Sequence, residues 1–225
     1  MIRLIDIAIS ATVLILTAPL LIVVAIAIRA SSPGPIFYLA DRVGMGGQLF
    51  QMYKFRSMHA NTGGPDITAT NDKRVFAVGR IIRVLKLDEA PQFLNVLRGD
   101  MAIVGPRPEA PSIVSNHYNL WMNETLAVRP GLTSPGALFY YAYGDELLDI
   151  ADPERIYVEK FLAPKLALDL AYLKRENVIS NLTIMARTVV AIFAKLIGRP
   201  IGPQFVDIEA SRQWCPDGIY FRGDP

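Results

Sequence analysis

One apolar stretch, residues 4–28, limits more than any other feature what this chain can fold into. Its 25 residues carry a single charge, Asp6. A straight helix of this length would extend roughly 37 Å, which is enough to cross a bilayer. The stretch is too long for a signal peptide, and the residues after Arg29 do not form a small-residue cleavage site. We therefore expect a permanent membrane helix.

Two details of this stretch bear on its topology. Pro19 lies inside it, and proline bends or breaks a helix. Arg3 and Arg29 flank both ends, and positive charge favours the cytoplasmic side. This pattern suits a helix-break-helix that enters and leaves the membrane on the same side. An ordinary bitopic helix with a tolerated proline fits the composition equally well, so these residues leave both topologies open.

The residues after the anchor read as one compact domain. Two apolar and aromatic runs between residues 35 and 58 are separated by three glycines, which predicts a β-hairpin. The polar residues 60–73 predict a surface loop beside it. Apolar residues at helical spacing predict helices near residues 75–85, 91–98, 112–127, 154–175 and 178–197, and Gly99 is expected to stop the second of them.

The fold class expected from these elements is α+β and mostly helical. Residues 1–30 would form the membrane anchor and residues 31–198 the compact domain. Residues 199–225 are rich in proline, glycine and charge, and we expect an irregular tail there. The apolar positions of the helix at 178–197 suit either the domain core or contact with lipid.

Composition excludes several classes of function. The net charge is +2, from 23 basic and 21 acidic residues, so a broad nucleic-acid-binding surface has no support. Cys215 is the only cysteine, and His59 and His117 are the only histidines, which removes the usual zinc sites. A divalent metal would therefore be held by oxygen ligands and phosphates, as magnesium or manganese is.

Asp88 and Glu89 stand out among the residues able to do chemistry. They precede Pro91, and proline favours the first turn of a helix, so the two carboxylates are expected at a helix N-terminus. Unpaired backbone N–H groups there attract phosphates. Neighbouring helical positions point about 100° apart, so one carboxylate could attack phosphorus while the other holds a metal. The alternative is that the pair only caps the helix.

Basic residues could balance the charge of a transferred phosphate, namely Lys54, Arg56, Arg83, Lys86 and Arg107. Arg107 lies between two prolines, in the segment 105–108, which predicts a rigid loop that presents a guanidinium. A rigid turn without a function fits this segment as well. Lys54 and Arg56 also fit solvated positions on a strand.

Six segments in one order resemble the bacterial sugar transferase family of monotopic phosphoglycosyl transferases. They are RLIDIAIS with TAPLL, SPGPIFY with DRVG, YKFRSM, LDEAPQFLNVLRGDM, VGPRP and VRPGLT, from about residue 3 to residue 188. An ordered set of motifs is far more specific than any one of them.

The resemblance implies a reaction, in which a sugar phosphate moves from a UDP-sugar to polyprenol (undecaprenyl) phosphate. The family is expected to use a covalent aspartyl intermediate and Mg²⁺, with Mn²⁺ as the alternative, in the first membrane step of glycoconjugate synthesis. Asp88 then matches the nucleophile, and Glu89 joins it in the magnesium site. The family's phosphate-binding lysine and arginines match Lys54, Arg83 and Arg107.

The same resemblance implies a place in the cell. Family members carry a re-entrant helix bent at a proline, which matches Pro19 and favours same-side topology. We expect the bacterial inner membrane, with the catalytic domain on its cytoplasmic face. The expected partners are the UDP-sugar, polyprenol phosphate and the lipid bilayer but no nucleic acid, and a homodimer stays open.

The chain departs from the family's pattern in several places. Ala18 stands where a serine commonly precedes the bend proline, and residues 134–139 replace a usual Gly-Trp-Ala-Gln, which leaves the sugar open. Asp169 matches one acidic position of a later helix, Asn181 replaces another, and residues 145–163 are extra.

Two other functions remain as alternatives. One is a one-step metal-dependent transferase without a covalent intermediate. The other is a non-catalytic membrane-bound interaction module, against which the intact Asp88, Glu89, Lys54 and Arg107 argue.

Overall fold

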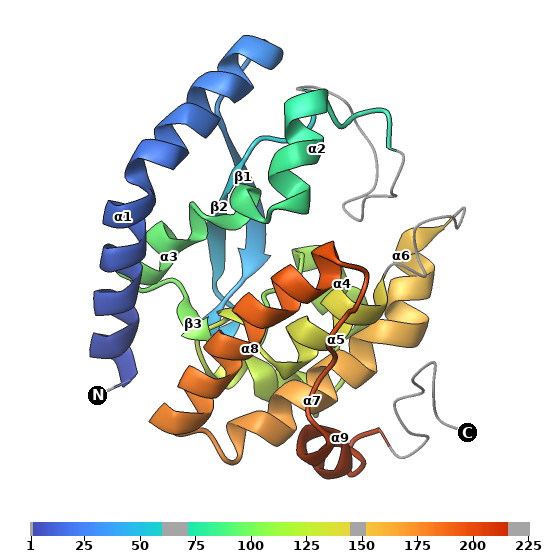
Figure 1. The fold of residues 1–225 in the computed structure, drawn as a ribbon. Helices are drawn as coiled ribbons and strands as arrows, with labels where there is room; N and C mark the ends of the chain where they lie inside the picture. The colour runs from blue at the N-terminus through green and yellow to red at the C-terminus, as the bar shows by residue number, and fades with distance from the viewer. Residues whose placement is uncertain (1, 60–71, 145–151, 216–225) are drawn as a thin grey trace.

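The computed structural model describes residues 2–59, 72–144 and 152–215. A long helix, α1 (Ile2–Ser31), lies along one side of an α+β body that contains the other described elements (Figure 1). The expected fold class, α+β and mostly helical, is confirmed. The loop predicted at residues 60–73 falls outside the described residues, apart from its last two positions.

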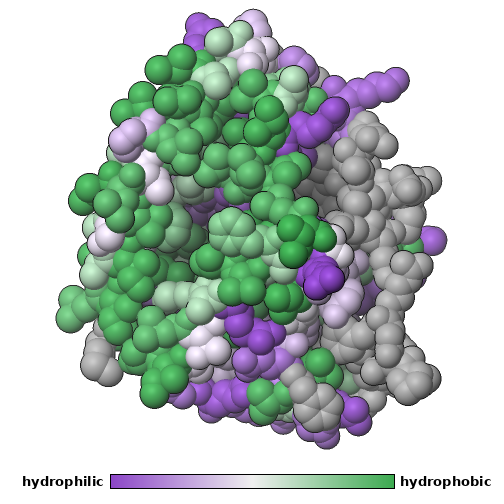
Figure 2. All heavy atoms as spheres, viewed as in Figure 1, coloured by the Kyte–Doolittle hydropathy of each residue, from purple (hydrophilic) through white to green (hydrophobic). Residues whose placement is uncertain are grey.

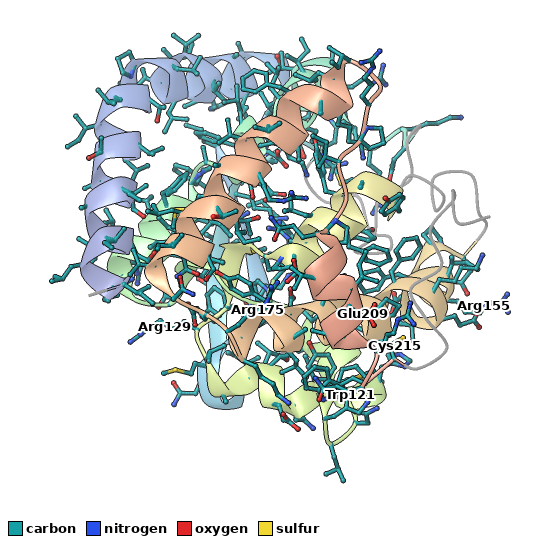
Figure 3. All side chains as sticks on the ribbon, turned by 60° about the horizontal axis from the view of Figure 1, so that its bottom comes forward. Trp121, Arg129, Arg155, Arg175, Glu209 and Cys215 are labelled. Atoms are coloured by element: carbon teal, nitrogen blue, oxygen red, sulfur yellow. The ribbon has the colours of Figure 1, made fainter. Side chains whose placement is uncertain are left out.

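The anchor is a single helix, although the sequence predicted a helix-break-helix. α1 contains Pro19 and stays helical through it. Figure 3 shows α1 changing direction sharply about half way along. Proline removes one backbone donor and its ring crowds the preceding turn, which explains a bend without a full break. α1 is long and apolar enough to cross a membrane, whereas its topology there stays a prediction.

Both ends of α1 contact the same body. At the start, Arg3 donates hydrogen bonds to the carbonyl oxygens of Val96 (2.6 Å) and Met101 (3.3 Å). At the other end, Val24 and Ile28 are buried against apolar side chains of the hairpin and of the helix that follows it. The domain therefore holds α1 at two separate points.

The predicted β-hairpin is confirmed. β1 (Phe37–Val43) and β2 (Leu49–Phe55) pair antiparallel. The 3₁₀ turn η1 (Met45–Gly47) joins them, and Gly46 and Gly47 have φ angles of 69° and 77°, which glycine adopts without strain.

A run of short elements follows the hairpin. It comprises α2 (Ala77–Val84), the 3₁₀ turn η2 (Leu87–Glu89), α3 (Gln92–Arg98) and β3 (Ala102–Val104). Gly99 ends α3 in the left-handed conformation, with φ at 96°, so the predicted stop is confirmed. β3 pairs in parallel with β4 (Gly131–Thr133).

The helix predicted for residues 112–127 is divided in two. α4 (Pro111–His117) is followed by the 3₁₀ turn η3 (Met122–Ala127). Between them the Asn119 side chain accepts a hydrogen bond from the backbone N–H of Met122, at 3.1 Å. Asparagine side chains compete with helical hydrogen bonds in this way, which explains the interruption.

The remaining helices form the lower half of Figure 1. They are α5 (Pro135–Tyr143), α6 (Pro153–Ile156), the π-helical segment η5 (Tyr157–Leu162), α7 (Ala163–Leu173) and α8 (Val178–Leu196). α7 lies at the centre of this half and packs against α5, η3 and η5.

The sequence predicted an irregular tail, and this prediction is wrong for one segment. The tail contains the helix α9 (Phe205–Ser211). α9 packs on α7. Asp207 is fully buried there and pairs with Arg175, one of the residues labelled in Figure 3. The pair is partly exposed at Arg175, and together with the packing on α7 it places the segment against residues that are distant in the sequence.

α8 divides its apolar residues between the core and the surface. Ile184 and Ala191 are buried. Val189 and Phe193 are exposed, at 54% and 65%. Figure 2 shows hydrophobic residues spread over much of the face that carries α1 and α8. α8 is also long and apolar enough to cross a membrane by length and composition. A large exposed apolar area of this kind suits contact with lipid.

Candidate functional site

Asp88 and Glu89 lie in η2, the turn that joins α2 to α3. Lys86 starts this turn with φ at 57°, and it is the only non-glycine residue with positive φ in the described ranges. Strained backbone of this kind is concentrated at functional sites. The sequence placed the pair at a helix N-terminus, and the structure places it one turn before α3.

The capping alternative is wrong for α3. Pro91 occupies the N-cap position, and no side chain caps the helix there. Asp88 is only 9% exposed, and its Oδ1 has no hydrogen-bond partner among the described residues. A buried carboxylate oxygen without a partner is costly, so it points to a ligand or a reaction at this position.

Glu89 pairs with two cations. Its Oε2 accepts a hydrogen bond from Arg107 at 2.7 Å, and its Oε1 lies 3.5 Å from Lys86 Nζ. Arg107 also donates to the carbonyl oxygen of Leu132, at 3.1 Å. The guanidinium therefore points toward the dyad from a fixed position.

The rigid loop predicted around Arg107 is confirmed, and the fold explains its rigidity. Gly105 N–H donates to the Thr133 carbonyl at 3.0 Å, and Gly131 N–H donates to the Pro106 carbonyl at 2.9 Å. A Cβ on Gly105 would lie 2.6 Å from the Arg129 carbonyl oxygen. Only glycine lets the two backbones approach so closely.

Lys54 reaches the dyad from β2. Asn95 of α3 fastens that strand, because its Oδ1 accepts from Tyr53 N–H at 2.9 Å and its Nδ2 donates to the Gln51 carbonyl at 2.8 Å. Burial lowers the pKa of Lys54 to about 8, although the negative charge of Glu89 opposes this shift. Lys54 is thus a positive charge beside the carboxylates, not a solvated strand residue.

Of the other two predicted basic residues, Arg83 lies near the dyad and Arg56 does not. Arg83 donates to Ser57 Oγ at 2.9 Å, and Asp88 is among the charges acting on it. Arg56 is 5% exposed, and its nitrogens donate to Ser32, Pro33 and Pro35. Arg56 therefore fixes the connection between α1 and β1, and we do not keep it in the phosphate-binding set.

The two carboxylates have opposite electrostatic environments. Burial raises the pKa of Asp88, and the adjacent Glu89 raises it further. Burial also opposes the charge of Glu89, but Arg107, Lys86 and Lys54 outweigh it and hold the pKa of that carboxyl well below its usual range. The carboxylate of Glu89 therefore stays ionised, whereas the carboxylate of Asp88 has the higher affinity for a proton. Such a pair can divide its roles in catalysis.

The donor set fits a magnesium ion that is shared with a substrate. No group of three or more histidine, cysteine, aspartate or glutamate side chains is gathered within the described ranges. Mg²⁺ commonly uses one or two carboxylates and completes its shell with phosphate oxygens and water. Among the described residues the Oδ1 of Asp88 has no partner, so it can meet that need. Glu89 can add a second carboxylate oxygen, since its Oε1 lies no closer than 3.5 Å to Lys86 Nζ. The metal itself stays a prediction.

A buried network supports the Arg107 loop from behind. Glu109 accepts hydrogen bonds from Lys165 and Tyr157, and its carbonyl oxygen accepts from Val43 N–H at 3.0 Å. Asp169, which the sequence matched to a family position, accepts from Gly136 N–H at 2.8 Å, and burial raises its pKa to about 7. These residues link the loop to β1 and α7.

Sequence reasoning named Lys86 but missed three residues near it and the dyad, which are Gln92, Tyr141 and Lys195. Gln92 is fully buried, and neither atom of its amide has a partner among the described residues. Lys86 and Lys195 both lie close to the Tyr141 ring. Gln92 could have been found because it follows the dyad within the same motif, whereas only tertiary structure joins Tyr141 and Lys195 to Lys86.

Known proteins include sequences similar to this chain. The sequence model of the family described as "Bacterial sugar transferase" matches residues 1–195. A protein of Caulobacter vibrioides named UDP-glucose:undecaprenyl-phosphate glucose-1-phosphate transferase is 38% identical, over 83% of this chain and 67% of its own length.

Two further relatives carry names of the same kind. An Aeromonas hydrophila UDP-N-acetylgalactosamine-undecaprenyl-phosphate N-acetylgalactosaminephosphotransferase is 36% identical, over 82% of this chain and 41% of its own length. An Escherichia coli UDP-glucose:undecaprenyl-phosphate glucose-1-phosphate transferase is 41% identical, over 57% of this chain and 28% of its own length. The matched region is thus a minor part of these two longer proteins.

Proposed function

The chain belongs to the bacterial sugar transferase family, and on this premise we propose that it moves a sugar phosphate from a UDP-sugar to polyprenol phosphate. The products would be a polyprenol diphosphosugar and UMP. The observation that carries the proposal is the buried Asp88, one oxygen of which has no partner among the described residues, beside an anionic Glu89 that Arg107, Lys86 and Lys54 surround.

In the first step, an Asp88 oxygen attacks the β-phosphorus of the UDP-sugar. The bond from that phosphorus to the bridging oxygen breaks, and UMP leaves with the electron pair. A sugar phosphate stays on the carboxylate. Arg107 and Lys54 offset the negative charge of the phosphoryl group, and the raised pKa of Asp88 makes it the better nucleophile of the pair.

In the second step, a phosphate oxygen of polyprenol phosphate attacks the same phosphorus. The bond to Asp88 breaks, a diphosphate forms and the carboxylate is regenerated. Glu89 keeps Arg107 and Lys86 in place through both steps.

A magnesium ion is the cofactor that this site suits, with manganese as the alternative. Asp88 and Glu89 would hold it together with the diphosphate of the donor. When bound, the ion would neutralise the diphosphate and make UMP a better leaving group.

The contacts of α1 favour the re-entrant topology. Arg3 at its start and Ile28 near its end touch the same body, and the helix bends between them. A straight span would carry its ends to opposite faces. We infer that both ends lie on the cytoplasmic face of the bacterial inner membrane, where the active site can meet a lipid phosphate.

Cysteine labelling tests this topology. In a Cys215→Ser background, Ile2→Cys and Ala30→Cys should react with a membrane-impermeant maleimide only in inside-out vesicles. Leu120→Cys, at a position 93% exposed on the domain, reports the side of the domain itself. Labelling of the first two positions from opposite sides would support a bitopic helix instead.

A panel of UDP-sugars tests the function. In nanodiscs, the chain should release UMP from at least one of them when Mg²⁺ is present and EDTA should stop the release. UMP release without a lipid acceptor supports the covalent route. Release only in the presence of acceptor supports the one-step transferase, and no release with any sugar supports the non-catalytic module.

A further inference from the structure

The side chain of Gln92 is buried without a hydrogen bond to any described residue. Its exposed fraction is 0%, and neither Nε2 nor Oε1 has a partner among the residues that the structure describes. A glutamine amide carries both donors and an acceptor, and leaving them unused in the protein interior is costly. A buried polar group of this kind calls for an explanation, and a ligand that binds there is one.

Asn95, one turn further along α3, shows how a buried amide is satisfied on the same helix. It is also fully buried. Its Oδ1 accepts a hydrogen bond from Tyr53 N–H at 2.9 Å, and its Nδ2 donates to the Gln51 carbonyl oxygen at 2.8 Å. These bonds fasten α3 to β2. An amide with a purely structural role on α3 is thus expected to make such bonds, and Gln92 makes none to the described residues.

Gln92 lies on the same side of the chain as Asp88. The two residues between η2 and α3, Ala90 and Pro91, have right-handed helical φ and ψ angles, so the backbone runs on as one helical path. Residues four apart on such a path share a face. Both η2 and α3 pack on β2, the strand that carries Lys54. The fold therefore places the Gln92 amide on the side of α3 where the reacting carboxylate lies.

The Asp88 carboxylate supplies the second buried polar atom without a partner in this part of the described chain, its Oδ1. A phosphoryl group bonded to Asp88 brings its non-bridging oxygens to the adjoining turn of the helix. These oxygens accept hydrogen bonds and carry the charge that is spread during transfer. The Gln92 amide can donate to them. Because the amide is neutral, it does not pair with the nucleophilic carboxylate as another cation would.

We propose that Gln92 is a further catalytic residue, whose Nε2 donates a hydrogen bond to a non-bridging oxygen of the phosphoryl group that Asp88 attacks. This inference rests on the proposed function and adds to it a neutral donor for the transferred group. The same phosphorus reacts in both steps, so Gln92 acts in both. The unused amide lowers the stability of the protein without substrate, which is the usual consequence of keeping a polar group ready for a reaction.

Gln92→Met tests this role, because activity and stability should change in opposite directions. Methionine has a similar length and no group that requires a hydrogen bond. The thermal unfolding midpoint should equal or exceed that of wild type, since the unpartnered amide is gone. Adduct formation from the UDP-sugar, and transfer from the adduct to undecaprenyl phosphate, should each slow by about 10²-fold, the effect of removing one donor to developing charge. Gln92→Leu should show the same pattern.

Two variants are the matched controls. Gln51→Met makes the same change at an exposed position of β2, and it should alter neither the midpoint nor either rate by more than about threefold. Asn95→Leu removes a buried amide whose partners are seen. Its midpoint should fall by about 5 °C or more, because Tyr53 N–H and the Gln51 carbonyl oxygen lose their hydrogen bonds.

The outcomes separate this inference from the proposed function. A midpoint of Gln92→Met that falls as far as that of Asn95→Leu would make Gln92 a structural residue and overturn the inference. Rates within about threefold of wild type would overturn it as well. Slowing of one step alone would assign Gln92 to a group that only one substrate brings, which contradicts a donor to the shared phosphoryl group. Wild-type protein that releases no UMP from any UDP-sugar contradicts the proposed function itself.

Discussion

Asp88→Asn should form no sugar-phosphate adduct with a UDP-sugar and should lose turnover by more than about 10³-fold. The amide keeps the size of the side chain but cannot act as a nucleophile. Because Oδ1 has no partner among the described residues, the change breaks no hydrogen bond seen there. Intact-protein mass spectrometry after incubation with donor and Mg²⁺ measures the adduct, and UMP release measures turnover.

Asp41→Asn is the matched control, since Asp41 is an exposed carboxylate on the hairpin that carries Lys54. It should form the adduct and turn over at close to the wild-type rate. An adduct on Asp88→Asn protein would show that another residue is the nucleophile. An equal thermal unfolding midpoint for the two variants would confirm that folding is not the cause of the difference.

Arg107→Ala should lower turnover by about 10²- to 10³-fold, the usual effect of removing one group that stabilises developing charge. The structure adds a second consequence, because Glu89 loses the partner at 2.7 Å that helps to hold its pKa low. The proton affinity of Glu89 should therefore rise, and the acidic limb of the rate profile should shift to higher pH. The rate of UMP release as a function of pH measures both effects.

Arg155→Ala is the control for this change, because Arg155 lies on α6 at the edge of the molecule and is largely exposed (Figure 3). Its pair with Glu159 is a surface ion pair and is worth little. Arg107→Lys should retain part of the activity, since charge remains but the two-pronged contact is lost. A loss of less than about threefold in Arg107→Ala, with an unchanged pH profile, would assign Arg107 to the loop structure alone.

Local sequence was sufficient for much of the fold. The length and polarity of residues 4–28 predicted α1, and the glycines between two aromatic runs predicted the hairpin. Gly99 predicted the end of α3. Local sequence did not predict α9, whose packing on α7 and ion pair between Asp207 and Arg175 join residues far apart in the chain.

Part of the site was likewise predicted from the sequence, and part of it was decided by the tertiary structure. Motif order predicted Asp88, Glu89, Lys54, Arg83 and Arg107 as site residues, because the phosphoryl transfer that we propose needs these residue types in one place. The same reasoning included Arg56, whose position is decided by the carbonyl oxygens of the turn after α1. The burial of a side chain and its hydrogen-bond partners distinguish basic residues beside the dyad from Arg56, which binds backbone carbonyl oxygens. A sequence shows neither property.

The sequence by itself determined the long apolar helix, the hairpin and the position of the acidic pair in a motif, because periodicity, glycine conformation and motif order are local properties of the chain. Only the tertiary structure decided which carboxylate stays ionised, since Arg107, Lys86 and Lys54 come from separate elements. It also joined Lys195 and Tyr141 to the dyad. Electrostatic energy depends on distances between charges and on burial, and both are set by how the chain packs.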